Sequence, residues 1–359
     1  MLAIGIVGLP NVGKSTLFNA LTDNDILAAN YPFATIEPNT GIVPVPDSRL
    51  QRLGELYGTQ NIKPATVTFV DIAGLVAGAS EGEGLGNQFL ANIRSCNAIC
   101  HVVRAFEDDN VIHVDEKHDP KNDIETINTE LILADLQTIE KRLPKLQKEA
   151  KANPRLKDEV ALLTRVETAL KEGTIVGRLG LTNKESELLQ DLHLLTAKPV
   201  IYMFNVDEKT LSDESRQTEL RALVSPALAI FVCAKLESEL RGLDESDSNE
   251  LLESYGVHEK GLNQLIHAAY DTLGLQSYLT AGEKEVRAWT IRKDSTAPQA
   301  AGVIHGDFER GFIAAEIVAY QDLITAGSMQ SAKAAGKVRT EGKDYIMKPD
   351  DVVEFRFNV

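Results

Sequence analysis

The residues with the clearest chemical capacity in this chain of 359 residues lie close to its start. Gly8-Leu9-Pro10-Asn11-Val12-Gly13-Lys14-Ser15 has the spacing G-x-x-x-x-G-K-S. In this spacing the glycines let successive backbone N–H groups face phosphate oxygens, the lysine adds a catalytic cation, and the serine hydroxyl can bind Mg²⁺. We therefore predict that a nucleoside triphosphate is bound by Asn11, Val12, Gly13, Lys14, Ser15 and Thr16.

The segments on either side fit the elements that hold such a loop. The run from Leu2 to Val7 is short, apolar and rich in β-branched residues, which predicts a buried strand, and Thr16 to Leu21 predicts the helix that follows. Strand, loop and helix in this order are the context that a P-loop requires. We therefore predict an α/β fold.

Two later segments supply candidates for Mg²⁺ and for the γ-phosphate. Thr35 lies before the predicted strand Gly41 to Val45, where a threonine can complete the Mg²⁺ shell, although it fits an ordinary loop threonine equally well. The predicted strand Ala65 to Val70 runs into Asp71-Ile72-Ala73-Gly74. We expect Asp71 to support Mg²⁺ through a water molecule and the Gly74 N–H to meet the γ-phosphate as a catalytic group.

The residue after Gly74 predicts slow hydrolysis of the bound nucleotide. Ras-like proteins have a glutamine there to orient the attacking water, whereas this chain has Leu75, which cannot form that hydrogen bond. Glutamine and arginine-finger groups contribute on the order of 10³–10⁵ to such rates. The glycine-rich segment from Gly78 to Gly86 follows, and it is either a segment that changes with the nucleotide state or a plain connector.

The base-recognition segment departs from the guanine pattern. Guanine-specific pockets of this class use N-K-x-D after a later strand, and here the predicted strand Val200 to Phe204 is followed by Asn205-Val206-Asp207-Glu208. Glutamate is one methylene longer than the aspartate that accepts from guanine, so the strong discrimination that such hydrogen bonds give is expected to be relaxed. We assign the base site to Asn205, Val206, Glu208 and, after the strand Ala229 to Cys233, Ala234.

Together these motifs resemble the YchF or Obg-like ATPase family of translation-factor-type P-loop GTPases. The resemblance rests on the P-loop, Thr35, the sequences DIAGL at 71–75 and GEGLGNQF at 82–89, the NVDE departure at 205–208, and the C-terminal segments 286–290 and 297–302. It implies a Ras-like, mostly parallel sheet with helices on both faces and a C-terminal TGS module of the β-grasp fold. It also implies a pocket that binds ATP with Mg²⁺ and hydrolyses it slowly, and association with ribosomes.

The resemblance adds roles for two residues that their surroundings in the sequence leave open. Asn11 matches an asparagine that holds K⁺ in K⁺-stimulated relatives, but it also fits a simple loop residue. His113 matches a histidine proposed to replace the missing glutamine, but it also fits a surface or core histidine. His113 is therefore carried as a catalytic candidate on the resemblance alone.

The middle of the chain predicts a helical hairpin. Apolar residues recur at spacings of four and three, which is a coiled-coil seam, through Ile132, Leu136, Ile139, Leu143, Leu146 and Ala150. Asn153-Pro154 predicts the turn, and Pro144 is expected to kink or interrupt the first helix. We predict a nucleotide domain over residues 1–277, interrupted by an antiparallel coiled-coil insertion over 124–195, and a TGS domain over 278–359.

Charge restricts the partners. The formal net charge is −16, which opposes non-specific coating of nucleic acid, and no DNA partner is expected. Residues 141–171, however, contain nine basic and four acidic side chains, and a second basic group is formed by Lys333, Lys337, Arg339 and Lys343. Each group fits either a contact with ribosomal RNA or an ordinary solvated surface.

The chain is expected to be cytoplasmic and free of membrane segments, because its three cysteines suit a reducing compartment and its apolar runs are short. The leading hypothesis is a Mg²⁺-dependent ATPase that regulates translation or a stress response from the ribosome. A GTP-dependent translational switch, or an RNA- or ribosome-binding adaptor with incidental hydrolysis, are the alternatives.

Overall fold

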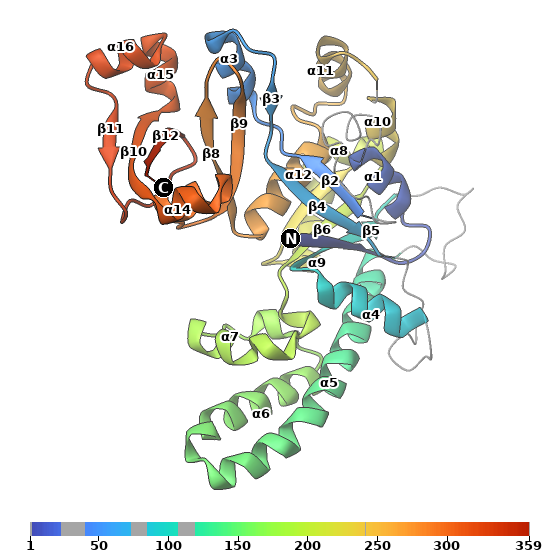
Figure 1. Ribbon diagram of the computed structural model, residues 1–359. Helices are drawn as coiled ribbons and strands as arrows, with labels where there is room; N and C mark the ends of the chain where they lie inside the picture. Colours follow the sequence, from blue (N-terminus) through green and yellow to red (C-terminus); the bar gives the residue numbers. More distant parts are fainter. Residues whose placement is uncertain (1, 23–39, 73–84, 107–118, 241, 359) are drawn as a thin grey trace. The chain divides into compact units, whose positions relative to one another are not determined.

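The computed structural model in Figure 1 describes residues 2–22, 40–72, 85–106, 119–240 and 242–358. Thr35, Gly74 and His113 lie outside these residues. The chain forms two compact units, one from residues 1–41 and 68–265, the other from residues 42–67 and 266–359. The fold of each unit is described separately.

The first unit is built on a sheet of mainly parallel strands. Its order is β2 (Thr40–Pro44), β4 (Thr66–Asp71), β1 (Ala3–Val7), β5 (Ala98–Arg104), β6 (Val200–Asn205) and β7 (Leu228–Val232). The pairs β1–β4, β1–β5, β5–β6 and β6–β7 are parallel. All seven residues of β5 are buried although successive side chains point to opposite faces, so both faces of the sheet are covered. The predicted α/β P-loop fold is confirmed.

The helices that follow the strands begin at polar caps. Asp207, Asp213 and Asp244 each accept a hydrogen bond from a backbone N–H of the first turn of α8 (Glu208–Leu211), α9 (Glu214–Val224) and α11 (Glu245–Ser254). Such caps satisfy donors that a helix start leaves unpaired. The remaining helices of this layer are α1 (Lys14–Leu21), α4 (Leu85–Ser95), α10 (Ala234–Glu239) and α12 (Gly261–Thr272), the last of which runs into the second unit.

The predicted hairpin consists of α5 (Pro120–Ala152) and α6 (Lys157–Lys171), which project together below the sheet in Figure 1. Its seam is buried at Ile132, Ile139, Leu143 and Leu146 against Leu163, Val166 and Leu170 of α6, while Leu136 and Ala150 are only partly buried. Asn153 begins the turn by capping the segment Pro154–Leu156. None of the helices in the described ranges is long and apolar enough to span a bilayer.

Pro144 does not interrupt the helix, contrary to the sequence prediction. α5 continues through it from Pro120 to Ala152, with Pro144 exposed. Proline removes one backbone donor and crowds the preceding turn, but Leu143 and Leu146 on either side are buried in the seam. Packing of these neighbours holds the helical path.

The return of the insertion to the sheet is fixed by one buried carboxylate. Asp135 of α5 is fully buried and accepts hydrogen bonds from Leu195 N and Thr196 N, both 2.8 Å, and from Thr196 Oγ1 at 2.7 Å. The segment it holds includes α7 (Asn183–Leu189) and short 3₁₀ turns, which lead into β6. Burial raises the pKa of Asp135, although these hydrogen bonds and Arg94 favour its charged form.

The second unit is a mixed six-stranded sheet. Its order is β11 (Arg339–Glu341), β10 (Phe312–Ala319), β12 (Asp351–Phe357), β8 (Leu275–Ala281), β9 (Val286–Arg292) and β3 (Ile62–Lys63). β8 and β12 lie parallel at the centre, flanked by antiparallel neighbours, and α13 (Ala297–Ile304) contributes Ala297, Ala300 and Ala301 to the core. Adjacent parallel first and last strands of residues 275–357 fit the β-grasp arrangement that the resemblance implied. The other helices are α14 (Gly306–Arg310), α15 (Tyr320–Ala326) and α16 (Met329–Ala334).

The compact units are divided differently from the predicted domains. Residues 42–67, assigned from sequence to the nucleotide domain, supply α3 (Ser48–Tyr57) and β3 to the second unit, where β3 extends the sheet beside β9. The limits 1–277, 124–195 and 278–359 therefore stay a prediction about domains and do not coincide with the compact units.

Candidate functional site

The P-loop joins β1 to α1 in a conformation that leaves backbone donors available. Gly13 and Asn11 have φ values of 90° and 63°, in the left-handed region. α1 begins at Lys14, and no side chain caps its first N–H groups. Uncapped N–H groups and the positive end of the helix dipole together form an anion site. The structure thus gives Asn11 to Thr16 the arrangement expected of a phosphate-binding loop.

Close approach explains why glycine is needed inside this loop. A Cβ atom on Gly13 would lie 2.3 Å from Nδ2 of Asn205, and one on Gly8 would lie 2.7 Å from the carbonyl oxygen of Val102. Distances below about 3 Å are not tolerated without movement. The loop is therefore packed directly against the ends of β5 and β6.

Lys14 and Asp71 form the charged part of the loop. Lys14 Nζ lies 3.2 Å from Asp71 Oδ1, and their side chains are 10% and 16% exposed. This buried carboxylate oxygen accepts no hydrogen bond from the described residues, while the Ser15 side chain nearby in sequence is exposed. Carboxylate and hydroxyl oxygens are the ligands that Mg²⁺ prefers. The residues present therefore fit the predicted metal.

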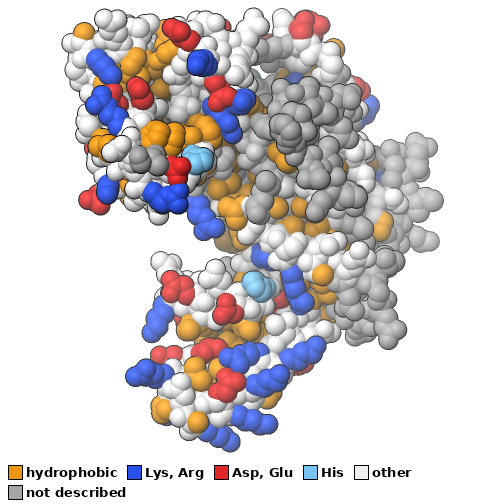
Figure 2. All heavy atoms as spheres, viewed as in Figure 1, with side chains coloured by type: hydrophobic (Ala, Val, Ile, Leu, Met, Phe, Trp, Pro, Cys, Tyr) orange, Lys and Arg blue, Asp and Glu red, His pale blue; other side chains and the backbone are white. Residues whose placement is uncertain are grey.

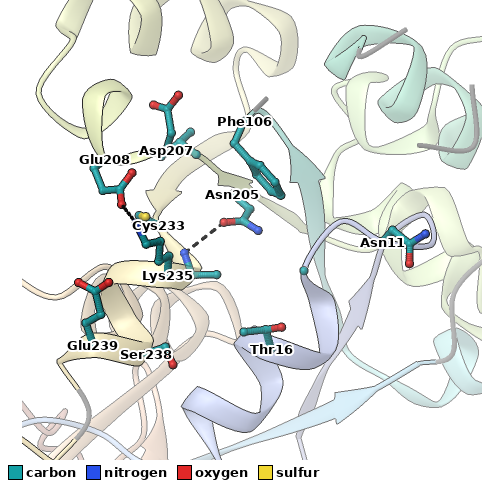
Figure 3. Close-up of a pocket in the computed structure, with 13 residues that line it drawn as sticks. Asn11, Thr16, Phe106, Asn205, Asp207, Glu208, Cys233, Lys235, Ser238 and Glu239 are labelled. Atoms are coloured by element: carbon teal, nitrogen blue, oxygen red, sulfur yellow. Dashed lines mark hydrogen bonds and ion pairs between the residues drawn. The ribbon is translucent and has the colours of Figure 1, made fainter. Parts of the chain in front are cut away.

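A pocket of about 740 Å³ opens beside the P-loop, within the first unit. Figure 3 shows Asn11 on one side of it and Glu208 with Glu239 on the other, with Thr16 and Asn205 between them. The lining residues come from the P-loop with α1, from the segment after β5, from β6 with α8, and from α10: Asn11, Gly13, Thr16, Phe106, Asn205, Val206, Asp207, Glu208, Cys233, Ala234, Lys235, Ser238 and Glu239.

Asn205 connects the phosphate end of this pocket with the other end. Its Nδ2 donates to Val12 O at 3.0 Å, and its Oδ1 accepts from Ala234 N at 3.2 Å. The side chain is 3% exposed. One buried amide thus fixes the P-loop backbone relative to the start of α10, and it brings together Val12, Asn205 and Ala234, three of the residues assigned to nucleotide binding from the sequence.

Glu208 is held by a lysine that sequence reasoning did not assign to the site. Lys235 Nζ lies 2.7 Å from Glu208 Oε1. The hydrogen bond from Lys235 lowers the pKa of Glu208, and the same bond raises the pKa of Lys235. Val206 is buried, and Asp207 caps α8 through Thr210 N at 2.9 Å, so neither side chain can make the contacts of the guanine-reading residues.

Other lining residues were also missed. Phe106 projects beside Asn205 in Figure 3, and its ring lies 4.5 Å from the guanidinium carbon of the buried Arg104. Ser238 and Glu239 are the last two residues of α10. Lys235 had a signal in the sequence, because it directly follows Ala234, whereas the other three follow only from the fold.

Comparison with known proteins assigns both parts of the chain. Residues 3–142 match the family MMR_HSR1, described as "50S ribosome-binding GTPase", and residues 275–358 match YchF-GTPase_C, described as "Protein of unknown function (DUF933)". The chain is 52% identical to "Ribosome-binding ATPase YchF" of Bacillus subtilis, with all of both chains covered. It is also 52% identical to the protein of that name from Haemophilus influenzae, with 99% of each covered.

Solved structures agree with this assignment. The "Schizosaccharomyces pombe YchF GTPase" superimposes with a TM-score of 0.88 at 40% identity and covers 99% of this chain and 97% of its own. A GTP-binding protein from Pyrococcus horikoshii, at 22% identity and a TM-score of 0.61 over the full length of both chains, shares the fold. By its sequence, its two matched segments and its structure, the chain belongs to the YchF family.

Proposed function

We propose that this chain is a Mg²⁺-dependent ATP hydrolase that acts in association with the ribosome. The phosphates lie on the N–H groups of the P-loop and α1, with Lys14 as their cation. The base lies between Asn205, Val206, Glu208 and Ala234. The geometry of Asn205 supports this proposal most directly, because its two hydrogen bonds join Val12 of the P-loop to Ala234 at the start of α10, and all three elements border one pocket.

Bound Mg²⁺ neutralises charge on the phosphate oxygens. In this chain Ser15 and Asp71 are the described residues that would hold it, and Lys14 would turn from Asp71 toward the phosphates when nucleotide binds. Positioning and charge stabilisation account for most of the catalysis in phosphoryl transfer. The roles of Thr35, Gly74 and His113, and of K⁺ at Asn11, stay predictions.

The choice of ATP is part of the proposal. Relatives of this chain carry both words in their names, "Ribosome-binding ATPase" and "YchF GTPase". The base end of the pocket favours ATP, because Val206 and Glu208 replace the guanine-reading residues and Glu208 is already paired with Lys235.

Single-turnover hydrolysis tests the proposal directly. The intact chain with Mg²⁺ and ATP is expected to turn over slowly alone and faster with ribosomes, and Lys14→Ala is expected to lose hydrolysis in both cases. Lys293→Ala, which removes an exposed lysine paired with Asp271, is the matched control and should hydrolyse ATP normally. Equal hydrolysis by the Lys14 variant and by this control would contradict the assignment of the site.

The ribosome contact is proposed at the end of the hairpin. Figure 2 shows Lys and Arg side chains gathered over the hairpin. Six of its cations are exposed and form no ion pair with described residues, namely Lys141, Lys145, Lys148, Lys151, Arg155 and Lys157. Such unpaired cations can release counterions from RNA phosphates. A protein that works on ribosomes in this way is cytoplasmic.

The second basic group supports an RNA contact less well. Lys333 lies 2.7 Å from Glu316, Lys337 lies 3.2 Å from Asp322, and Arg339 lies 3.3 Å from Glu341. These pairs would have to open before the cations could meet phosphate groups. We therefore favour the hairpin over the C-terminal unit as the RNA-binding surface.

A further inference from the structure

The base end of the nucleotide pocket contains a charge pair whose effect on nucleotide choice has a clear physical direction. Glu208 occupies the position at which guanine-specific relatives of this fold have their aspartate, and its carboxylate is still present in the pocket. The length of the side chain alone therefore does not explain why guanine should be disfavoured. In the structure this carboxylate is paired with the Lys235 ammonium, which lies 2.7 Å from Glu208 Oε1.

We propose that Lys235 is a specificity-determining residue that disfavours GTP by occupying the Glu208 carboxylate. A guanine base offers N1–H and N2–H₂ donors to a carboxylate, and Glu208 could accept them only by giving up or sharing its bond with Lys235. Adenine has no N1–H and no N2 amino group, so its binding does not require the pair to open. The inference rests on the proposed function, and it adds the residue that sets the preference.

The surroundings support this role. Glu208 is 28% exposed and Lys235 is 71% exposed, so the pair lies at the rim of the pocket, where a base can reach the carboxylate. Asp207, the other carboxylate nearby, already caps Thr210 N of α8. Figure 3 shows Glu208 of α8 and Lys235 of α10 joined on one side of the pocket, beside the bond from Asn205 to the start of α10. The fold thus holds both partners independently of the ligand.

The size of the effect follows from what such pairs contribute. Solvent screens such an exposed ion pair, so we expect a modest effect, roughly a two- to fivefold change in affinity. Lys235→Met keeps most of the aliphatic stem and removes the charge. Any general loss of attraction for a triphosphate affects ATP and GTP alike. The ratio of their dissociation constants therefore reports only the effect of the substitution on recognition of the base.

The test is a double-mutant cycle measured by calorimetry with ATP and with GTP, each with Mg²⁺, on the intact chain. Lys235→Met is expected to lower the ratio of the GTP Kd to the ATP Kd two- to fivefold. In the Glu208→Gln background the same substitution should leave the ratio unchanged, because no carboxylate remains to be released. Lys209→Met, an exposed neighbour on α8 that does not line the pocket, is the matched control and should match wild type.

Each result decides the matter. A ratio that Lys235→Met leaves at the wild-type value, while ATP still binds, overturns this inference and leaves the proposed function intact. A ratio that falls equally with and without the Glu208 carboxylate overturns it as well. A wild-type chain that binds neither nucleotide contradicts the proposed function and this inference together.

Discussion

At the scale of single residues, the site depends on one side chain that fixes backbone positions and one glycine that leaves room for it. Asn205 joins Val12 to Ala234, and Gly13 leaves room for its amide. Buried hydrogen bonds of this kind are costly to break, because the remaining donor or acceptor is left without a partner. Substitutions here should therefore affect binding of any nucleotide rather than the choice between nucleotides.

Gly13→Ala is expected to weaken ATP binding by at least tenfold. The left-handed backbone costs about 1–2 kcal/mol for alanine, and the new Cβ would also displace Asn205. Gly58→Ala is the matched control, since Gly58 has φ 68° but nothing within 4 Å of the added atom. It should lower the free energy of unfolding by about the same backbone cost and leave the ATP Kd unchanged, as chemical denaturation and calorimetry will show.

Asn205→Asp distinguishes the contributions of the two hydrogen bonds of Asn205, because it should keep one and lose the other. The carboxylate can still accept from Ala234 N, but it cannot donate to Val12 O. We expect a loss of about 1–3 kcal/mol in the free energy of unfolding and weaker binding of ATP and GTP by similar factors. Unchanged affinity for both would show that the P-loop does not need this amide.

Much of this site could be predicted from the sequence, because the P-loop and the segment from Asn205 to Glu208 have fixed spacings that require no knowledge of packing. Lys235 was not assigned, since its pairing with Glu208 depends on where α8 and α10 lie in the fold. Phe106 was missed for the same reason. Spacing along the chain identifies residues within one loop, but contacts between loops depend on the tertiary structure.

At the scale of elements, buried strands and helices determine how the protein responds to pH and to substitution. β5 is buried throughout, and its residue His101 is only 2% exposed, against the ring of Tyr202. Burial lowers the pKa of His101 from 6.5 to about 3. The unfolded chain therefore binds more protons than the folded chain between these pH values.

The free energy of unfolding should consequently fall as the pH is lowered from 6.5 toward 4, by up to about 1.4 kcal/mol per pH unit from this one group. His101→Phe should flatten that part of the pH profile, measured by denaturant unfolding at several pH values. His267→Gln, at an exposed position, should keep the wild-type slope. An identical slope in the His101 variant would rule out this histidine as the source.

Pro144 shows that packing can override the local rule that proline interrupts a helix. The sequence predicts a kink or an interruption at Pro144, and the interruption does not occur, because the buried seam on both sides keeps α5 continuous. Removing the proline restores a backbone donor, so Pro144→Ala should raise the free energy of unfolding by about 1–3 kcal/mol. A decrease in stability, measured in the same denaturation experiment, would mean that the proline is accommodated without cost.

At the scale of the whole molecule, the overall composition shows neither where the charges cluster nor how the chain is divided between the two units. The net charge of −16 coexists with a hairpin in which six exposed cations, from Lys141 to Lys157, form no ion pair with described residues. Between β2 and β4 of the nucleotide sheet, the chain supplies α3 and β3 to the second unit, and β3 extends the sheet there. That exchange could not be predicted, because a two-residue strand has no periodicity from which to recognise it.

The hairpin surface predicts how ribosome binding depends on salt. Lys141, Lys145 and Lys148 lie four and three residues apart, on one face of α5, and replacing all three with glutamine should weaken binding about tenfold or more and lower the salt slope by up to about three. The control replaces Lys333, Lys337 and Arg339, which are already ion-paired, and should change neither quantity appreciably. A greater loss of ribosome affinity in the control variant would indicate that the contact lies in the C-terminal unit instead.

The claim on which the whole account depends is that this pocket selects ATP. Competition between ATP and GTP for the intact chain, with Mg²⁺ and a fluorescent nucleotide as the displaced probe, measures that selection without requiring turnover or a partner. The account predicts that ATP displaces the probe at lower concentration than GTP, because Glu208 is held by Lys235 and Val206 offers no guanine contact. Displacement by GTP at the lower concentration would contradict it.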